Sequence, residues 1–301
     1  MIIGTGTEYP LNGELTLPDG LSEPVPAVVM VHGSGPSNMD EKVMKLTPFK
    51  DLAEGLAKQG IASLRYDKRT FVYGKKMAKL KDVTVKEETI EDALLAIEML
   101  KKDDKIDHDR IYILGHSMGA MLAPRIDAEG GDVRGLVLLA GTPCRLEEIV
   151  LRQLKQADYK NPLLKWIINL EYKTYSKKFR NLYQISDEEA KKQKFAGNMS
   201  LYYFKEMGQK TAADYLLENT KPVLIMQGGK DFQVLVDVDY TQFQEQLADR
   251  KNTIYKLYPE LNHCFVPGIY NDITKASKEY SVEQHIDEEV IGDIADFISG
   301  H

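Results

Sequence analysis

The sequence predicts an α/β protein, with a mostly parallel central sheet flanked by helices and a helical cap inserted after strand six. Short apolar runs that end in Gly or His alternate with longer segments at helical spacing, which is the order expected of a parallel sheet covered by helices. This alternation stops between residues 145 and 220. A chain of 301 residues, 43% of them apolar, is long enough to build a large core.

Six apolar runs predict the central strands of the sheet. Near-continuous apolar runs are typical of strands that are buried on both faces. In chain order, the runs are residues 27–31, 61–66, 110–114, 135–140, 222–227 and 253–258. Residues 11–17 precede them and are bounded by prolines, so we expect an antiparallel hairpin at the edge of the sheet.

Three segments at helical spacing predict helices that cover the sheet, at residues 49–57, 90–100 and 286–297. For the first, Thr47 is a candidate N-cap, Pro48 suits the first helical position, and Gly60 follows the end. A further helix is expected to start near Met118, and Pro124 removes one of its backbone hydrogen bonds. We therefore predict a kink or an early break at Pro124.

The stretch without strand–helix alternation divides the chain into two predicted units. Residues 1–144 and 221–301 form the core, and residues 145–220 form a helical cap, or lid. The cap holds 11 of the 26 aromatic residues, including Trp166, and 14 Lys and Arg against 10 Asp and Glu. Its aromatic side chains either fill a small core of its own or line an acyl or aryl pocket, and the sequence leaves both open.

The composition excludes several classes of protein. The longest apolar runs are five residues, whereas a membrane-spanning helix needs about 20. The net charge of −7 means that the chain has no overall excess of positive charge to attract nucleic acid. The first residues carry no signal-peptide pattern, so we expect a cytoplasmic protein in which Cys144 and Cys264 are free thiols. No zinc or dinucleotide signature is present, and neither a metal nor an organic cofactor is expected. A homodimer through the cap or an edge strand is left open.

One Gly-rich turn carries a nucleophile pattern. Gly115-His116-Ser117-Met118-Gly119 fits G-x-S-x-G and lies between a buried strand and a helical segment. In that setting the pattern forms a sharp strand-to-helix turn, which exposes the serine oxygen at the carboxyl edge of the sheet. The glycines are required because neighbouring chain comes too close for a Cβ atom. Ser117 is therefore the predicted nucleophile.

A serine hydroxyl also requires a base, most often a histidine, within hydrogen-bond reach. Of the six histidines, His263 follows a late strand on its carboxyl side, where catalytic groups gather in open α/β sheets. Asp231 follows the run 222–227 through two glycines and is the predicted acid that holds the imidazole. Asp237 and Asp239 follow closely, and the sequence does not exclude them.

Acyl transfer also requires N–H donors for the negative oxygen that develops on the substrate. The Met118 N–H stands at the start of the helix after the nucleophile. The second donor is expected in the first Gly-rich loop, at the Ser34 N–H beside Gly33. His32 and the Ser34 hydroxyl are expected to order that loop, and His285 is assigned to the last helix.

The chain order Ser117, Asp231, His263 resembles that of the α/β-hydrolase superfamily, with a likeness over roughly residues 10–300. Within it, the chain is most similar to bacterial carboxylesterases and serine-aminopeptidase-like hydrolases. Three stretches carry the likeness, at residues 65–69, 115–124 and 261–265. The resemblance implies an eight-stranded, mostly parallel sheet, a cap between strands six and seven, and a covalent acyl-enzyme.

The resemblance also implies that the turn at residues 66–69, which contains Lys68, is structural. Thr70 and Phe71 stand where a glycine often follows this turn, so the loop is expected to have a different shape.

Together these residues predict a serine hydrolase that cleaves small or aryl carboxylic esters through an acyl-enzyme. The fold hosts many chemistries, so the substrate class stays open. An aminopeptidase would need an acidic cap residue to bind the substrate ammonium, with Glu147, Glu148 or Glu171 as candidates. The positive charge of the cap favours anionic substrates such as acyl-CoA, which a thioesterase would cleave. A non-catalytic hydrolase-fold binding protein is the alternative of another class.

Overall fold

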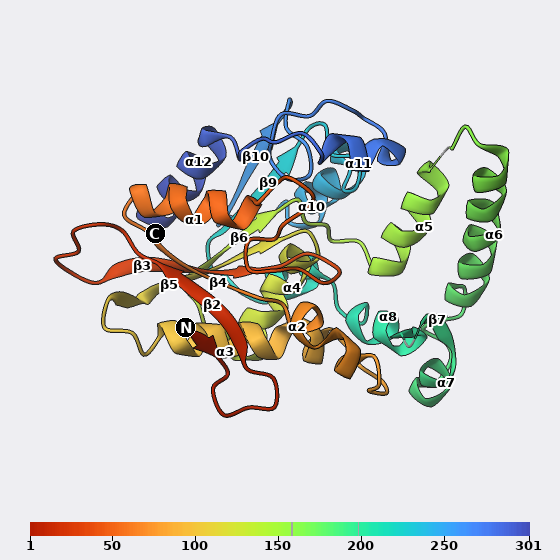
Figure 1. The fold of residues 1–301 in the computed structure, drawn as a ribbon, viewed down its shortest axis with the longest axis horizontal. Coiled ribbons are helices and arrows are strands. Elements are labelled where there is room, and N and C mark those ends of the chain that lie inside the picture. Colours follow the sequence, from red (N-terminus) through yellow and green to blue (C-terminus); the bar gives the residue numbers. More distant parts are fainter. Residues whose placement is uncertain (158, 198) are drawn as a thin grey trace.

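The computed structural model describes residues 1–157, 159–197 and 199–301. Its central sheet has eight strands in the order β1-β2-β4-β3-β5-β6-β9-β10 (Figure 1). The strands are β1 Ile2–Ile3, β2 Leu11–Thr16, β3 Val25–Val31, β4 Ala62–Tyr66, β5 Ile106–His116, β6 Gly135–Leu139, β9 Val223–Gly228 and β10 Thr253–Tyr258. Strands β3, β4, β5, β6, β9 and β10 run parallel, and β2 is antiparallel to both of its neighbours. The α/β prediction is confirmed.

All six predicted strands are present, and β1 and β2 form the expected edge hairpin. The prediction that residues 253–258 form a central strand is wrong, because β10 lies at the edge of the sheet and only Tyr258 of it is buried. Strand β5 is longer than predicted, because it begins at Ile106, and His108 therefore lies within it. It lies between β3 and β6, and its second half is buried on both faces. This central strand ends at His116, one residue before Ser117.

Helices cover both faces of the sheet (Figure 1). On one face, Phe49 of α1 and Val290 of α12 share an apolar cluster with Met30 of β3. On the other face, Ile97 of α3 joins Val31 of β3 and much of α4. The helices outside residues 145–220 are α1 Pro48–Lys58, α2 Arg69–Met77, α3 Glu91–Leu100, α4 Met118–Ile126, α10 Thr241–Gln246, α11 Ala276–Glu279 and α12 Glu288–Ser299. Four helical turns accompany them, η1 Lys86–Ile90, η2 Asp127–Gly131, η3 Val236–Tyr240 and η4 Ile273–Lys275.

Three local predictions are corrected by the structure. Thr47 stands at the N-cap position of α1, but its side chain makes no capping hydrogen bond. Helix α4 does not break at Pro124; it continues to Ile126 and then widens into the π-helical turn η2. His285 is not in the last helix, because it precedes α12, and its Nδ1 lies 3.1 Å from Asp51 Oδ1.

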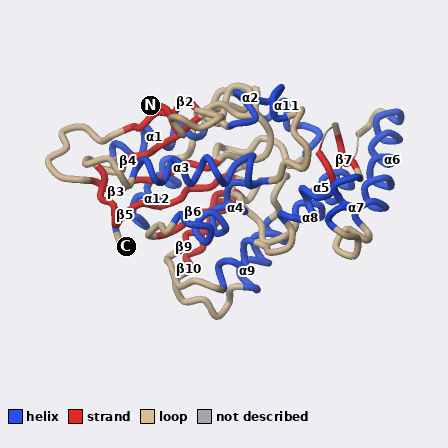
Figure 2. Tube along the Cα trace, turned by 90° about the horizontal axis from the view of Figure 1, so that it is seen from below, coloured by secondary structure: helices blue, strands red, loops and turns tan. Residues whose placement is uncertain are grey.

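Residues 145–220 fold mainly into helices. The described residues between 146 and 207 lie beyond one end of the sheet, whereas residues 212–217 pack beside α4 (Figures 1 and 2). Their elements are α5 Leu146–Gln156, α6 Pro162–Phe179, α7 Asp187–Lys192, β7 Lys194–Ala196, β8 Met199–Ser200, α8 Leu201–Met207 and α9 Ala212–Leu217. Phe179 of α6, Phe195 of β7 and Phe204 of α8 pack together with ring centroids 4.7–5.6 Å apart. Aromatic side chains therefore fill a core of this segment, which is one of the two roles considered for them.

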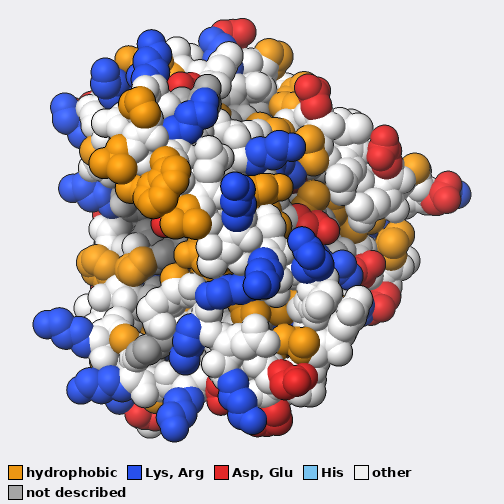
Figure 3. Space-filling view, turned by 90° about the vertical axis from the view of Figure 1, so that its right-hand side faces the viewer, with side chains coloured by type: hydrophobic (Ala, Val, Ile, Leu, Met, Phe, Trp, Pro, Cys, Tyr) orange, Lys and Arg blue, Asp and Glu red, His pale blue; other side chains and the backbone are white. Residues whose placement is uncertain are grey.

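The outer surface of residues 145–220 is both apolar and basic. Leu163, Trp166 and Leu170 of α6 are more than half exposed. Figure 3 shows hydrophobic side chains gathered on this end of the molecule, with Lys and Arg around them. Among the residues that the structure describes, no helix combines the length and the hydropathy of a membrane-crossing span.

Candidate active site

The turn between β5 and α4 holds Ser117 in a strained backbone conformation. Its φ of 54° and ψ of −117° lie outside the regions that ordinary L-residues favour. The Ser117 N–H donates to the Leu139 carbonyl oxygen at 2.8 Å, which ties the turn to the neighbouring strand β6. The side chain lines a cavity and is not fully buried. Ser117 is thus presented at the carboxyl end of the central strand, as the pattern predicts.

The two glycines of the turn have the steric role that the sequence suggested. A Cβ atom at Gly115 would overlap the Gly119 carbonyl oxygen, and one at Gly119 would overlap the Val31 carbonyl oxygen. The backbones of β3, β5 and α4 meet here without room for a side chain. Gly33 is also close, because a Cβ at that position would lie 3.2 Å from the Ser117 Cβ. The nucleophile turn therefore packs directly against the first Gly-rich loop.

His263 and Asp231 form a buried hydrogen-bonded pair. The His263 Nδ1 lies 2.7 Å from Asp231 Oδ2, and both residues are 5% exposed. The other carboxylate oxygen, Oδ1, accepts the N–H groups of Gln233 and Val234 at 2.7 and 3.0 Å. Gln227 at the end of β9 donates to Oδ2 at 3.1 Å. Asp231 therefore reaches the imidazole with both of its oxygens held in place.

The two alternative acids lie elsewhere. Asp239 is fully buried and accepts two hydrogen bonds from the Arg152 guanidinium, at 2.6 and 2.7 Å, and one from the Thr142 hydroxyl at 2.6 Å. Asp237 is exposed on η3. Among the described residues, Asp231 is paired with His263, and neither Asp237 nor Asp239 is.

The Ser117 hydroxyl makes no hydrogen bond to His263 among those of the described residues. Such bonds are often long without substrate and tighten when it binds. The backbone of His263 is nevertheless held beside the nucleophile, because the His116 Nε2–H donates to the His263 carbonyl oxygen at 2.9 Å. The two imidazole rings lie 4.8 Å apart between centroids.

His116 belongs to a second buried acid–histidine pair. Its Nδ1 lies 2.9 Å from Glu41 Oε2, and Glu41 Oε1 accepts the Gly33 N–H at 2.7 Å. Burial is the largest single influence and disfavours the charged imidazole, but the charge and hydrogen bond of Glu41, together with the hydrogen bond to the His263 carbonyl, raise the pKa of His116. Glu41 reaches this position with a φ of 50°, a strained value for a residue with a side chain. The pair joins the first Gly-rich loop to the backbone of His263.

Ser34, Ser117 and Met118 all line one cavity of about 380 Å³. No hydrogen bond within the described part of the chain uses the backbone N–H of either residue. Met118 is the first residue of α4, where N–H groups have no partner within the helix. Residues 145–220 supply much of the apolar wall, with Leu146, Ile149, Val150, Phe195, Met199 and Phe204.

Several residues at the site were missed by the sequence analysis. Glu41 and Glu88 are buried carboxylates next to the Gly-rich loop and the cavity, and Lys68 is a buried ammonium between them. Of these three residues, the sequence analysis singled out only Lys68, because it belongs to the turn after β4 that was expected to be structural. The two carboxylates lie in stretches without a recognisable pattern.

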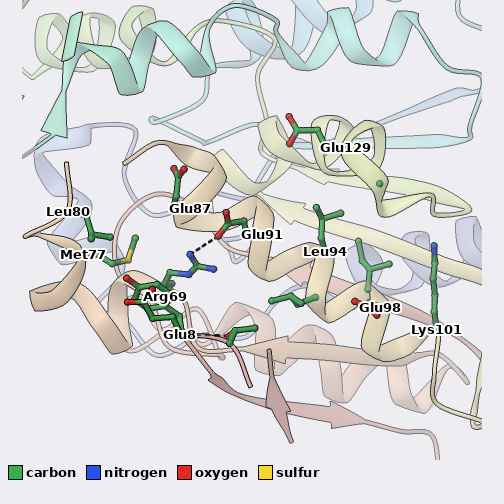
Figure 4. Close-up of a pocket in the computed structure, with 15 residues that line it drawn as sticks. Glu8, Arg69, Met77, Leu80, Glu87, Glu91, Leu94, Glu98, Lys101 and Glu129 are labelled. Carbon is green, nitrogen blue, oxygen red and sulfur yellow. Dashed lines mark hydrogen bonds and ion pairs between the residues drawn. The ribbon is translucent and has the colours of Figure 1, made fainter. Parts of the chain in front are cut away.

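A larger groove of about 880 Å³ lies away from this cavity (Figure 4). It contains none of the predicted site residues. Its polar rim is mostly acidic, and Glu91 in it is paired with the Arg69 guanidinium at 2.9 Å. In the described part of the chain, no group of three His, Cys, Asp or Glu side chains is arranged to hold a metal ion. Both Cys144 and Cys264 are free and buried.

The chain is similar to known hydrolases in sequence and in fold. The family described as serine aminopeptidase, S33, matches residues 22–267. The esterase EstD of Thermotoga maritima is 36% identical over 285 residues, which are 95% of this chain and 64% of EstD, so the chain spans less than two thirds of that relative. Est1E from Butyrivibrio proteoclasticus has a TM-score of 0.60 at 20% identity, covering 99% of this chain and 98% of Est1E. The Pyrococcus furiosus esterase Pf2001 has a TM-score of 0.58 at 18% identity, covering 100% and 91%.

The family match extends over most of the chain and includes strands β3 to β10, the Ser117 turn and His263. The structural similarities cover the same sheet and its helices. The chain therefore belongs to the serine aminopeptidase S33 family of α/β hydrolases.

Proposed function

We propose that this protein is a serine carboxylesterase in which Ser117, His263 and Asp231 form the catalytic triad. One observation carries the proposal: the His263 Nδ1 is paired at 2.7 Å with a buried carboxylate, beside a serine in a strained strand-to-helix turn. An acid on Nδ1 fixes the tautomer whose Nε2 can accept a proton. This arrangement suits acyl transfer.

The reaction proceeds in two steps. The Ser117 oxygen attacks the ester carbonyl while the His263 Nε2 takes its proton, and the Ser34 and Met118 N–H groups stabilise the oxyanion. His263 then protonates the leaving alcohol, which departs and leaves an acyl-enzyme. Water, activated by the same imidazole, hydrolyses that acyl-enzyme and restores Ser117. None of these steps requires a cofactor.

The substrate we propose is a small or aryl carboxylic ester. The cavity beside Ser117 is walled mostly by apolar side chains, which suits an uncharged acyl group. Residues 145–220 act as a lid, because their side chains supply much of the wall of the cavity that Ser117 lines. The esterase EstD, 36% identical, supports this reaction class.

An aminopeptidase is disfavoured by the partners of its candidate carboxylates. Glu147 accepts the Tyr183 hydroxyl at 2.6 Å, and Glu148 accepts the Arg145 N–H at 3.0 Å. Neither they nor Glu171 line the cavity. Glu88 does line it, but its charge is offset by Lys68 at 2.7 Å. No unpaired carboxylate of the described residues is thus available there for a substrate ammonium.

A substrate panel tests the proposal. We expect p-nitrophenyl esters of acetate, butyrate, octanoate and benzoate to be hydrolysed faster than aminoacyl p-nitroanilides or acyl-CoA. The Ser117→Ala variant should lose at least about 10³-fold in kcat on every ester, since the covalent step is removed. Faster hydrolysis of the anilides would replace the esterase with an aminopeptidase. Unchanged turnover in Ser117→Ala would refute the catalytic serine, and a lack of turnover on all substrates would favour a binding protein.

A further inference from the structure

Lys68 carries a buried ammonium group, and its burial must be compensated by the groups around it. Its side chain is 2% exposed, and burying an ammonium is costly unless it is paired and hydrogen-bonded. The Nζ donates to the Gly33 carbonyl oxygen at 2.9 Å and lies 2.7 Å from Glu88 Oε1. Lys68 thus connects the first Gly-rich loop to a carboxylate in the cavity wall.

The bond to Gly33 controls the orientation of the following N–H. The Gly33 carbonyl and the Ser34 N–H belong to one peptide unit, and the described peptide bonds are all trans. In a planar trans unit these two groups point in opposite directions, so holding the oxygen also holds the N–H. The preceding peptide unit is held as well, because Glu41 accepts the Gly33 N–H at 2.7 Å. Both peptide planes around Gly33 are therefore anchored by buried charges.

Glu88 extends this connection to residues 145–220. Its Oε2 accepts the Tyr203 hydroxyl of α8 at 2.9 Å, and Tyr203 is 3% exposed. The same hydroxyl lies 3.7 Å from the Met118 Sδ. Burial, and then the charge of Glu88, raises the pKa of Tyr203 well above its usual range, so the hydroxyl keeps its proton as a donor. Tyr203 thus contacts Met118 directly, and it is connected to the peptide unit of Gly33 and Ser34 through Glu88 and Lys68.

We propose that Lys68, Glu88 and Tyr203 form a positioning chain that sets the oxyanion hole and makes it depend on the docking of α8. This inference rests on the proposed esterase function. Lys68 orients the Ser34 N–H, Glu88 holds Lys68, and Tyr203 fixes Glu88 from the lid. Displacing α8 removes the outermost bond of the chain and loosens the Ser34 donor. The lid therefore does more than shape the acyl pocket, because its seated position completes the stabilisation of the oxyanion.

Three variants remove successive parts of this chain. Tyr203→Phe deletes only the hydroxyl, Glu88→Gln removes the charge that pairs with Lys68, and Lys68→Met/Glu88→Gln removes both charges without leaving either one unpaired. Since loss of one oxyanion donor costs on the order of 10²–10³ in rate, we expect about a fivefold fall in kcat for Tyr203→Phe and about 10²-fold for the double variant. KM should stay within about twofold, because the ground-state ester does not use the oxyanion contact fully.

A boronic acid gives a readout that a loss of packing would not reproduce. Phenylboronic acid forms a tetrahedral adduct with the serine oxygen, and its inhibition constant should rise by the same factor as kcat/KM falls. Tyr183→Phe is the matched control. The Tyr183 hydroxyl donates to Glu147 at 2.6 Å in the same segment, but that pair does not line the cavity. We expect its kcat to stay within about twofold of wild type.

The outcomes separate this inference from the proposed function. If Ser117→Ala keeps its turnover, the esterase proposal fails and the positioning chain fails with it. If Ser117→Ala is inactive while the folded double variant matches wild type in kcat, only the positioning chain is overturned. Should the double variant not fold, as judged by circular dichroism, Tyr203→Phe decides: a loss no larger than that of Tyr183→Phe also overturns the chain.

Discussion

Among single residues, buried carboxylates held by several donors set the geometry of the candidate site. Asp231 receives two backbone N–H groups, the Gln227 amide and the imidazole of His263. Glu41 binds the Gly33 N–H and lies beside His116. A carboxylate with several donors cannot rotate freely, so it fixes the groups it contacts. The geometry around Ser117 is thus set by buried acids that do not react.

Removing the charge of Asp231 tests its place in the triad. We expect Asp231→Asn to lower kcat on a p-nitrophenyl ester about 10⁴-fold, because the amide favours the wrong imidazole tautomer. Asp237→Asn is the control, since that carboxylate is exposed on η3 and its loss should leave kcat unchanged. A comparable loss in both variants, or none in Asp231→Asn, would contradict the assignment.

His32 should make stability depend on pH. Burial lowers the pKa of His32 from 6.5 to about 4, and its Nε2–H donates to the Asn38 carbonyl at 3.0 Å. Between those values the unfolded chain binds a proton that the folded one does not, so stability falls as pH falls. At 1.36 kcal/mol per pKa unit, the loss reaches about 3 kcal/mol by pH 4.

His32→Gln retains an amide donor for Asn38 and removes the titration. Urea unfolding of wild type and variant from pH 7 to pH 4 measures the effect. The difference in unfolding free energy should change by roughly 1 kcal/mol per pH unit below pH 6.5, in favour of the variant. If the unfolding free energies of wild type and variant change with pH in parallel, His32 does not titrate as inferred.

At the scale of elements, the unit β5–turn–α4 combines close packing with backbone strain. The turn has no room for side chains at Gly115 and Gly119, and Ser117 is held at a φ of 54° between them. Such strain persists only where the surroundings fix it. Here they do so through β3, which presses on α4, and through β6, whose Leu139 carbonyl accepts the Ser117 N–H. The central position of β5 in the sheet is therefore part of how the serine is presented.

A methyl group at the tightest contact should damage this unit. Gly119→Ala places a Cβ against the Val31 carbonyl oxygen, and we expect a loss of about 2–3 kcal/mol in unfolding free energy together with lower kcat. Gly292→Ala in α12 is the matched control, because no heavy atom lies within 4 Å of its added Cβ. The unfolding free energy of that variant should rise by up to about 1 kcal/mol, because alanine has a higher helix propensity than glycine. Equal stability of the two variants would contradict the packing argument.

In the molecule as a whole, ion pairs with one buried and one partly buried partner connect residues 145–220 to the rest of the chain. Arg152 of α5 binds Asp239 of η3 at 2.6 Å, and Arg125 of α4 binds Glu206 of α8 at 2.5 Å. Removing one partner of a buried pair leaves the other charge without compensation. These two contacts hold α5 and α8, the helices that wall the cavity and carry Tyr203.

Breaking the first of these pairs should destabilise the protein. Asp239 is fully buried, so Arg152→Met should lower the unfolding free energy by about 3 kcal/mol. Lys191→Met removes a more exposed pair with Glu188 of the same segment and should cost less than about 1 kcal/mol. Urea unfolding gives the comparison, and limited proteolysis should cut Arg152→Met earlier within residues 145–220. Equal losses in the two variants would refute the role of the buried pair.

Much of the fold and part of the site were predictable because their signals are local. Apolar runs mark the six parallel strands, and the spacing of glycines marks the Ser117 turn. His263 and Asp231 were candidates because each follows a strand at the carboxyl edge, and the structure pairs them. Thr47, Pro124 and His285 show where local rules fall short: a cap residue need not make its bond, a helix can pass a proline, and helix boundaries shift by several residues.

Periodicity and turn chemistry act over a few residues, so the class of fold, the succession of strands along the chain and the candidate nucleophile could be predicted from the sequence alone. The folded chain was needed to show which acid is paired with His263 and which buried charges hold the Gly33 loop. Lys68 reaches a carbonyl 35 residues away, and Tyr203 reaches a carboxylate 115 residues away. Such pairs form where packing excludes water from side chains that carry no pattern in the sequence, so their partners emerge only when the chain is folded.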